Sequence, residues 1–392
     1  MQDAPIAQGQ LTEKDLRGWR MLDDFQDVLA QVATPARLHR TFADPRRQLT
    51  CSGYLSLFLF GLFNPVVESM RALCSISRLP KVQQTVGCGP VSLGSFSETQ
   101  AVLDPALLAQ VFRGLYQRVQ SQNREEARLA ALNLVIQDGS LWSALPRMAW
   151  AEYGVGRTGD AKGVRLHLRF HLVADKPLEA RVTAGKVCER KMLRELCVAG
   201  QTNVGDRYYG EDYHLFQEID LASGFFVFRI KEGAVVHVEK ELPLSPEDQA
   251  AGVVRHLWAR LGARNPSMRL RLVEIRTADQ HLLLVTNLAL DKAPAELVGL
   301  IYRRRWAIEL FFRWIKCILG CRHFFAESPE GVALQLYLAL IASLLFQLYT
   351  GRRPNKRMME LIHFHQLGWA SAQELQSLLA AEMAKLNRAK KR

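Results

Sequence analysis

One acid stands among several bases in the segment 301–320, IYRRRWAIELFFRWIKCILG, which reads as an amphipathic helix. At roughly 100° per residue, Glu309 shares a helical face with aromatic and cationic side chains, beside an apolar stripe. Its carboxylate either pairs with the flanking cations or binds a divalent cation beside a surface that holds phosphates. The face consists of Tyr302, Arg305, Glu309, Arg313 and Lys316, and the stripe consists of Ile301, Ile308, Phe311, Phe312, Ile315 and Leu319.

The spacing along this face resembles the pattern Y-x2-R-x3-E-x6-K, the YREK signature of a large family of bacterial insertion-sequence transposases. The chain therefore resembles a DDE transposase with a ribonuclease-H-like core, over roughly residues 90–350. The residues that match the signature are Tyr302, Arg305, Glu309 and Lys316.

The resemblance implies two aspartates that follow core strands and complete a catalytic triad with Glu309. The first matches Asp138 in LNLVIQDGSLW, at the end of an apolar run that predicts a strand followed by a turn. The second matches Asp206 in VGDRYYG, where the family usually has Asp-Arg-Gly-Tyr and this chain has Asp-Arg-Tyr-Tyr. Asp212 is the alternative for this second position. The implied catalytic and metal-binding residues are therefore Asp138, Asp206 and Glu309.

The chemistry of phosphodiester cleavage is consistent with such a triad. The reaction needs an activated oxygen nucleophile and stabilised charge on the entering and leaving oxygens, which two Mg²⁺ ions about 4 Å apart supply. Mg²⁺ prefers carboxylate oxygens and keeps several waters, so three acids suit it, with Mn²⁺ as a substitute. The residues expected to bind DNA, through phosphate contacts or base stacking, are Tyr302, Arg305, Arg313 and Lys316.

The function that the resemblance implies is that of a DNA transposase. Such an enzyme binds the ends of its mobile element and catalyses metal-dependent strand cleavage and strand transfer in cut-and-paste transposition. Its expected partners are double-stranded DNA, from the terminal repeats and the target, and a second copy of the chain in the synaptic complex. The alternative is a catalytically inactive or domesticated DNA-binding protein derived from a transposase.

Composition agrees with a nucleic-acid partner. The formal net charge is +12 and the isoelectric point is near 9.5, which favours nucleic acid first and an anionic membrane second. The cysteines lack C-x-x-C spacing and the N-terminus lacks an apolar signal region, so we expect a cytoplasmic, nucleoid-associated protein with reduced thiols. The uncharged segment 332–349 lies at the lower edge of a membrane-spanning length, and a buried central helix is the favoured interpretation.

The elements that must position these residues predict an α/β fold. We expect a ribonuclease-H-like mixed sheet core with a β-rich insertion, flanked by helical N- and C-terminal regions. The predicted regions are a helical DNA-binding region at 1–125, a catalytic core at 126–232 and 291–350, a β-rich insertion at 233–290, and a basic C-terminal helical region at 351–392.

Local patterns add detail around the expected site. The segment 164–175 alternates as a strand, with His167 and His171 on a solvated or DNA-facing strand edge rather than on a metal ion. The segment 189–199 has the apolar spacing of a helix, and 246–262 has it too.

Overall fold

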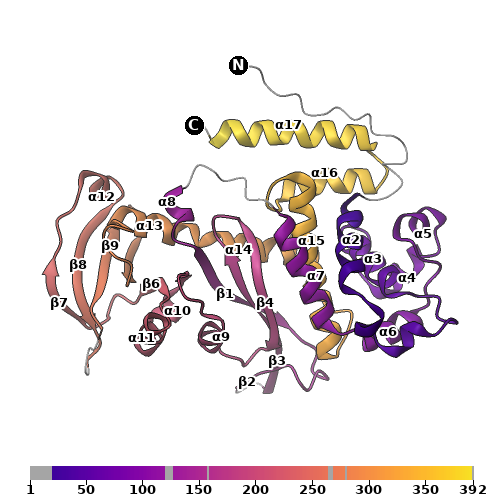
Figure 1. The fold of residues 1–392 in the computed structure, drawn as a ribbon, viewed down its shortest axis with the longest axis horizontal. Coiled ribbons are helices and arrows are strands. Elements are labelled where there is room, and N and C mark those ends of the chain that lie inside the picture. Colours follow the sequence, from indigo (N-terminus) through magenta and orange to yellow (C-terminus); the bar gives the residue numbers. More distant parts are fainter. Residues whose placement is uncertain (1–19, 120–126, 157–158, 264–267, 279, 391–392) are drawn as a thin grey trace. The chain divides into compact units, whose positions relative to one another are not determined.

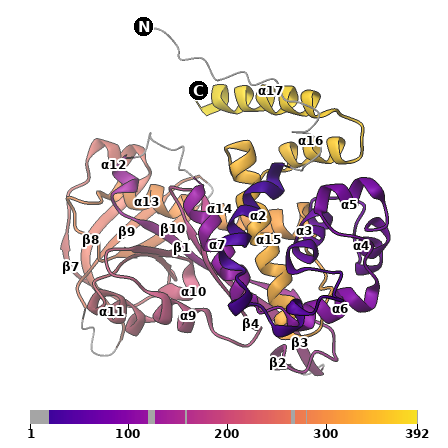
Figure 2. The ribbon, with the colours of Figure 1, turned by 45° about the vertical axis from the view of Figure 1, so that its right-hand side comes forward.

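The computed structural model describes residues 20–119, 127–156, 159–263, 268–278 and 280–390. The chain divides into two compact units, one formed by Met1–Gln120 with Arg313–Arg392 and the other by Ser121–Phe312. The first is helical and the second contains the sheet, as the labelled elements show (Figures 1 and 2). We call them the helical unit and the mixed unit, and each is described by itself.

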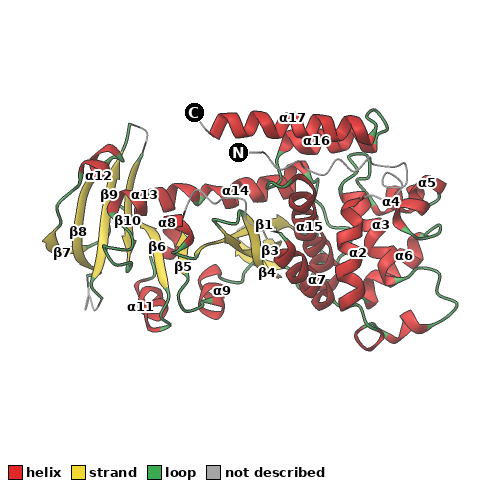
Figure 3. Cartoon of the chain, turned by 45° about the horizontal axis from the view of Figure 1, so that its top comes forward, coloured by secondary structure: helices red, strands yellow, loops and turns green. Residues whose placement is uncertain are grey.

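The centre of the mixed unit is a sheet with both parallel and antiparallel pairs (Figure 3). Strand β1 pairs antiparallel with β3, which pairs antiparallel with β4, while β1, β5 and β6 run parallel to one another. This order, β4-β3-β1-β5-β6, confirms the predicted ribonuclease-H-like mixed core. The strands are β1 (Leu134–Ser143), β2 (Glu152–Gly156), β3 (Gly159–His171), β4 (Lys176–Ala184), β5 (Thr202–Gly205) and β6 (Phe225–Ile230).

Strand β3 alternates as predicted, and from Val164 to Phe170 every residue is buried except Arg165, which is half-buried. Its partners β1 and β4 flank it on both sides, so it isn't an edge strand. His167 and Arg169 are each only 4% exposed, and His167 forms a 2.9 Å hydrogen bond with Thr183. The ring of His171, which is half-buried, accepts a hydrogen bond from the Ala174 amide. The predicted solvated or DNA-facing edge is therefore wrong for His167, and for His171 it stays a prediction. The buried apolar face consists of Val164, Leu166, Leu168 and Phe170.

The sheet continues beyond β6 through the strands expected between 233 and 290. Strand β10 pairs antiparallel with β6 and with β9, which leads to β8 and β7. The helix predicted at 246–262 is wrong, because the helix ends at Ala250 and Gly252, with φ +83°, turns the chain into β8. The elements are β7 (Val236–Glu241), α12 (Pro246–Ala250), β8 (Val253–Leu261), β9 (Leu270–Arg276) and β10 (His281–Thr286).

Short helices connect the strands of the mixed unit and carry several of the predicted site residues. Helix α9 confirms the helix predicted at 189–199, and α10 begins directly after Asp206. The helices are α8 (Ala127–Ala130), α9 (Glu189–Leu196), α10 (Arg207–Gly210), α11 (Tyr213–Leu221), α13 (Ala295–Arg304) and α14 (Trp306–Arg313).

In the helical unit, α15 (Pro329–Thr350) packs against four other helices: α2 (Arg20–Val32), α3 (Cys51–Leu62), α6 (Leu93–Val102) and α7 (Pro105–Arg118). By length and composition α15 could cross a membrane, yet 83% of its most apolar window is buried inside the protein. The predicted buried central helix is therefore confirmed. The remaining elements are η1 (Pro35–Arg37), η2 (Arg40–Ala43), α4 (Met70–Ile76), α5 (Pro80–Val86), η3 (Trp314–Ile318), α16 (Lys356–Gln366) and α17 (Ala372–Lys390).

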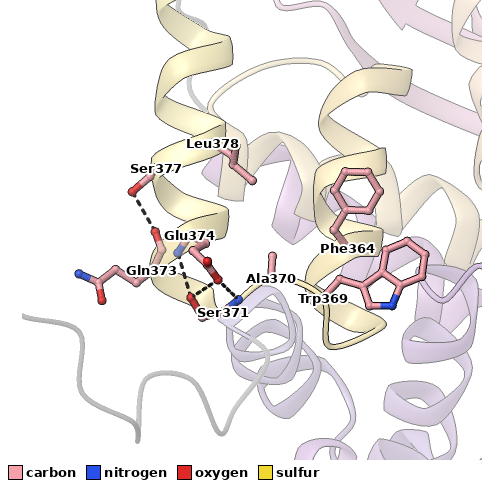
Figure 4. A pocket seen from close by; sticks show the side chains of 8 residues that line it. All are labelled: Phe364, Trp369, Ala370, Ser371, Gln373, Glu374, Ser377 and Leu378. Carbon is pink, nitrogen blue, oxygen red and sulfur yellow. Dashed lines mark hydrogen bonds between the residues drawn. The ribbon is translucent and has the colours of Figure 1, made fainter.

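A surface hollow of about 940 Å³ lies where α16 turns into α17 (Figure 4). The indole of Trp369 stacks on Phe364 with ring centroids 5.9 Å apart and is largely exposed. The carboxylate of Glu374 accepts hydrogen bonds from the amide and hydroxyl of Ser371, which caps the start of α17. The hollow is thus an aromatic surface built by the turn between two helices.

The close packing of α10 on β6 allows a test of the fold near Asp206. A Cβ atom on Gly210 would lie 1.9 Å from the carbonyl oxygen of Arg229, so Gly210→Ala must displace backbone. We expect it to lower the free energy of unfolding by about 1–3 kcal/mol in urea titrations. Gly233→Ala is the control, because no atom lies within 4 Å of its added Cβ. Equal stability of the two variants would contradict this packing.

Candidate active site

The two predicted aspartates lie at the ends of neighbouring parallel strands. The register pairs Ile136 of β1 with Val204 of β5, so Asp138 and Asp206 each follow two residues later in the same direction. Parallel neighbours in register bring such residues to the same edge of the sheet. The structure corrects one detail, because β1 continues through Asp138 to Ser143 instead of turning there.

Local hydrogen bonds fix both aspartates. The Oδ1 atom of Asp138 accepts the Gly139 amide at 2.8 Å. Asp206 is the N-cap residue of α10, and its Oδ1 accepts the Tyr208 amide at 2.9 Å. Such caps hold a carboxylate at the positive end of a helix and orient it.

The alternative residue, Asp212, has a different role. It is the N-cap of α11, where it accepts the Leu215 amide at 3.2 Å, and it forms a 2.7 Å ion pair with Arg194. Burial raises the pKa of Asp212, but the bonds from Arg194 and Leu215 outweigh it and hold this pKa below its usual value. Asp212 is therefore occupied in a helix cap and an ion pair, which favours Asp206 as the second acid.

Arg305 joins the first aspartate to the glutamate. Its guanidinium lies 3.9 Å from Oδ2 of Asp138 and forms an ion pair with Glu309, one helical turn further on. The Arg305 side chain is only 16% exposed and lies over the ring of Tyr302, 5.8 Å from its centroid. Burial lowers the pKa of Arg305, but Tyr302, Glu309 and Asp138 outweigh it and raise this pKa. The pair with Glu309 is thus part of a half-buried cluster and not an isolated surface pair.

The helix predicted at 301–320 is present in pieces. Helix α13 ends at Arg304, α14 begins at Trp306, and η3 (Trp314–Ile318) is a π-helix. Arg305 lies between α13 and α14, where i→i+3 hydrogen bonds tighten the turn: its amide donates to Tyr302, and the Ile308 amide donates to Arg305. The predicted common face therefore holds for Tyr302, Arg305 and Glu309, and all members of the predicted apolar stripe are buried.

Arg313 and Lys316 belong to the helical unit and not to the mixed unit. Arg313 is exposed at the end of α14, and Lys316 lies in the π-helix, where an ideal wheel of roughly 100° per residue no longer applies. Burial lowers the pKa of Lys316. The contact of these two cations with DNA stays a prediction.

The surroundings of Asp138 disfavour the charged form of its carboxylate. Burial and then the nearby charge of Glu189 raise the pKa of Asp138 from 3.8 to about 7, and Asp206 adds to the effect. The Gly139 amide and Arg305 oppose it. Neighbouring anions disfavour each other's charged forms, and a bound cation would stabilise these forms.

Glu189 is the acid that the sequence analysis did not identify. It is the first residue of α9, pairs with Arg165 of β3, and lies 3.4 Å from the Tyr209 hydroxyl, which donates to it. An acid in the first turn of a helix is common, because it interacts favourably with the helix dipole. The sequence therefore held no signal that set Glu189 apart.

The donor groups of this site suit a hard divalent cation, because carboxylate oxygens are the ligands that Mg²⁺ prefers. In the part of the chain that the structure describes, no three His, Cys, Asp or Glu side chains form a ready-made metal-binding group. The guanidinium of Arg305 supplies positive charge between Asp138 and Glu309 instead. Its Nε atom is buried without a hydrogen-bond partner among the described residues.

The sequence pattern of the family described as "Transposase DDE domain" matches residues 129–345, which is more than half of the chain. The chain belongs to this transposase family. The match confirms the family predicted from the sequence, while the YREK signature and the catalytic roles of Asp138, Asp206 and Glu309 stay predictions.

Two similar proteins are also transposases by name. The chain is 28% identical over 286 residues to a putative transposase, y4zB, of Sinorhizobium fredii, covering 71% of this chain and 77% of that protein. It is 28% identical over 229 residues to a probable transposase for insertion sequence element IS5377 of Geobacillus stearothermophilus, covering 58% of this chain and 59% of that protein.

A solved structure, the cryo-EM structure of a piggyBac transposase synaptic complex with hairpin DNA, has a TM-score of 0.45 to this chain at 10% identity. The match covers 93% of this chain and 81% of that chain. At this score the likeness decides neither the fold nor the function.

The raised pKa of Asp138 predicts how stability varies with pH in the absence of metal. Between pH 4 and 7 the folded DDE transposase keeps a proton on Asp138 that the unfolded chain has lost, so stability falls as pH rises. Asp138→Asn removes this loss and keeps an acceptor for the Gly139 amide. In EDTA at pH 8 we expect the variant to be more stable by about 1 kcal/mol or more, equivalent to about 2–4 °C in Tm.

At pH 4 the Tm values of Asp138→Asn and the wild type, measured by calorimetry in EDTA, should differ little, because both proteins then carry a neutral side chain at this position. If the Tm values of the wild type and the variant change in parallel from pH 4 to pH 8, Asp138 has an ordinary pKa and the prediction is wrong.

Proposed function

We propose that this chain is a DNA transposase that binds the ends of its mobile element and catalyses metal-dependent strand cleavage and strand transfer, by cut-and-paste transposition. The observation that carries the proposal is the position of Arg305 between Asp138 of β1 and Glu309 of α14. These acids are far apart in the sequence, and one half-buried cation lies beside both of them in a chain of the transposase DDE family.

In this proposal Asp138, Asp206 and Glu309 are the catalytic and metal-binding residues. They would hold two Mg²⁺ ions, or Mn²⁺ in their place, which activate an oxygen nucleophile and neutralise charge on the leaving oxygen. The parallel register of β1 and β5 supports the pairing of the two aspartates, and the anionic surroundings of Asp138 favour a divalent cation.

Arg305 and Tyr302 are proposed to act together on the DNA backbone. Tyr302 is 8% exposed, so its ring supports the Arg305 guanidinium rather than offering a free stacking surface. The Arg305 side chain is 16% exposed, and a phosphate oxygen is an acceptor of suitable charge for its guanidinium. Arg313 and Lys316 are also proposed to contact the DNA backbone.

The proposal also covers the partners of the protein and its location. A net charge of +12 favours contact with polyanionic DNA over an extended surface, both at the terminal repeats and at the target. We propose that a homodimer brings two element ends together in the synaptic complex, and that the protein works in the cytoplasm on the nucleoid.

Glu309→Ala tests the catalytic assignment. We expect the variant to lose Mg²⁺-dependent nicking of end-containing DNA, because its neighbours on the helix are cations that cannot replace a carboxylate. Gel-shift affinity for the same DNA should stay unchanged or become slightly tighter, because the face becomes more positive. Glu247→Ala is the control, since it removes an exposed acid from α12 with the same change in net charge.

If Glu309→Ala nicks at a rate close to that of the wild type, Glu309 only neutralises Arg305 and the catalytic assignment fails. If the wild type binds the ends but does not nick them with Mg²⁺ or Mn²⁺, the alternative of an inactive or domesticated DNA-binding protein gains support.

Salt dependence tests the proposed phosphate contacts. With about six phosphates contacted, affinity for element ends should fall by about a thousandfold between 50 and 200 mM salt, because Lys and Arg displace counterions. Lys316→Ala should lower the slope of log affinity against log salt by about 1. Affinity that barely changes over this range would rule out a phosphate-tracking surface.

A further inference from the structure

Glu189 is a buried acid that the proposed triad leaves unused. Its side chain is only 12% exposed, although it begins a surface helix. Arg165 reaches it from β3, and the Tyr209 hydroxyl donates to its Oε2 atom at 3.4 Å. The carboxylate is therefore held from two sides, by residues of different elements.

The packing of Glu189 on Gly139 brings this carboxylate next to Asp138. A Cβ atom on Gly139 would lie 2.6 Å from Oε1 and 2.8 Å from Cδ of Glu189, so the carboxylate occupies the space that any larger residue would fill. The amide of Gly139 in turn donates to Asp138 at 2.8 Å. A shift of Glu189 would therefore change the backbone group that orients the Asp138 carboxylate.

Glu189 also lies near both aspartates. Its carboxylate packs against Gly139, the residue after Asp138, and accepts a hydrogen bond from Tyr209, three residues after Asp206. An acid that only stabilised the start of α9 would need contacts with its helix, Arg165 and Tyr209. It would not need to lie near two further anions. Burying like charges together costs free energy, which a function at this place can explain.

We propose that Glu189 is a positioning residue of the catalytic site. It fixes the Asp138 carboxylate through Gly139, and it adds the negative charge that strengthens divalent-cation binding at Asp138. This inference rests on the proposed function, because it presumes that Asp138 binds the cation.

Direct Mn²⁺ binding to the full chain without DNA, measured by electron paramagnetic resonance, tests the inference. Glu189→Gln keeps the shape of the side chain and its acceptor oxygen but removes the charge. We expect it to weaken Mn²⁺ binding by about 10–100-fold, as for other groups that support a metal ligand. If Glu189 only packs α9 against the sheet, the isosteric variant should bind Mn²⁺ as the wild type does, and that result would overturn the inference.

Glu195→Gln is the matched control on the same helix. Glu195 pairs with Arg181 at 2.8 Å, as Glu189 pairs with Arg165, but its side chain is 38% exposed. It should leave Mn²⁺ affinity unchanged, and equal weakening by both variants would show a general effect of charge and overturn the inference.

Gly139→Ala provides a second route should Glu189→Gln not fold. The added Cβ displaces the Glu189 carboxylate while every charge is kept, and we again expect weaker Mn²⁺ binding. A folded Gly139→Ala protein with wild-type affinity counts against the inference.

Asp138→Asn separates this inference from the proposed function. If the wild type binds no Mn²⁺, or if Asp138→Asn does not weaken binding, the proposed cation site fails and the role of Glu189 fails with it. If Asp138→Asn weakens binding and Glu189→Gln does not, only the role of Glu189 is overturned.

Discussion

The guanidinium of Arg305 neutralises two carboxylates that reach it from opposite ends of the mixed unit's sequence. Asp138 comes from the first strand and Glu309 from the last helix of that unit, and both lie beside a cation that is itself half-buried. Unpaired charges in such a place are expensive, so each acid depends on a positive neighbour. The strands and helices around Asp138 therefore keep several anions close to the guanidinium of Arg305.

The sheet supplies the other constraint. Because β1 and β5 run parallel and in register, Asp138 and Asp206 reach the same edge, and the cap that starts α10 turns Asp206 there. Helix α9 brings Glu189 to the same place from β4. Asp138 therefore has negative neighbours, and burial together with the charges of Glu189 and Asp206 raises its pKa.

Much of this arrangement could be predicted from the sequence, because local patterns decided it. The apolar alternation of β3, the long apolar helix α15 and the spacing of Tyr302, Arg305 and Glu309 are properties of short segments, and the structure has them as expected. The family follows from a few residue types at fixed spacings, and the match over 129–345 confirms it.

The rest depends on contacts between distant segments. Thr202–Gly205 is a weak strand by composition, yet β1 and β6 pair with it on both sides. His167 was expected on a solvated or DNA-facing edge, but it is buried in a strand that β1 and β4 flank on both sides. The segment 246–262 has helical apolar spacing, but Gly252 and the pairing of β8 with its neighbours override it. Glu189 lies near Asp138 because α9 packs beside Gly139, and the residues of α9 alone do not predict this contact.

The central claim is that Asp138, Asp206 and Glu309 share one cation site, and a crystal structure with bound Mn²⁺ tests it most directly. Anomalous scattering locates the ion without reference to activity. The account predicts an anomalous peak within coordination distance of Asp138, with the carboxylates of Asp206 and Glu309 gathered around the same ion or its neighbour. An ion bound elsewhere, or a Glu309 carboxylate more than ~10 Å from that of Asp138, where no pair of ions ~4 Å apart could bridge them, would contradict it.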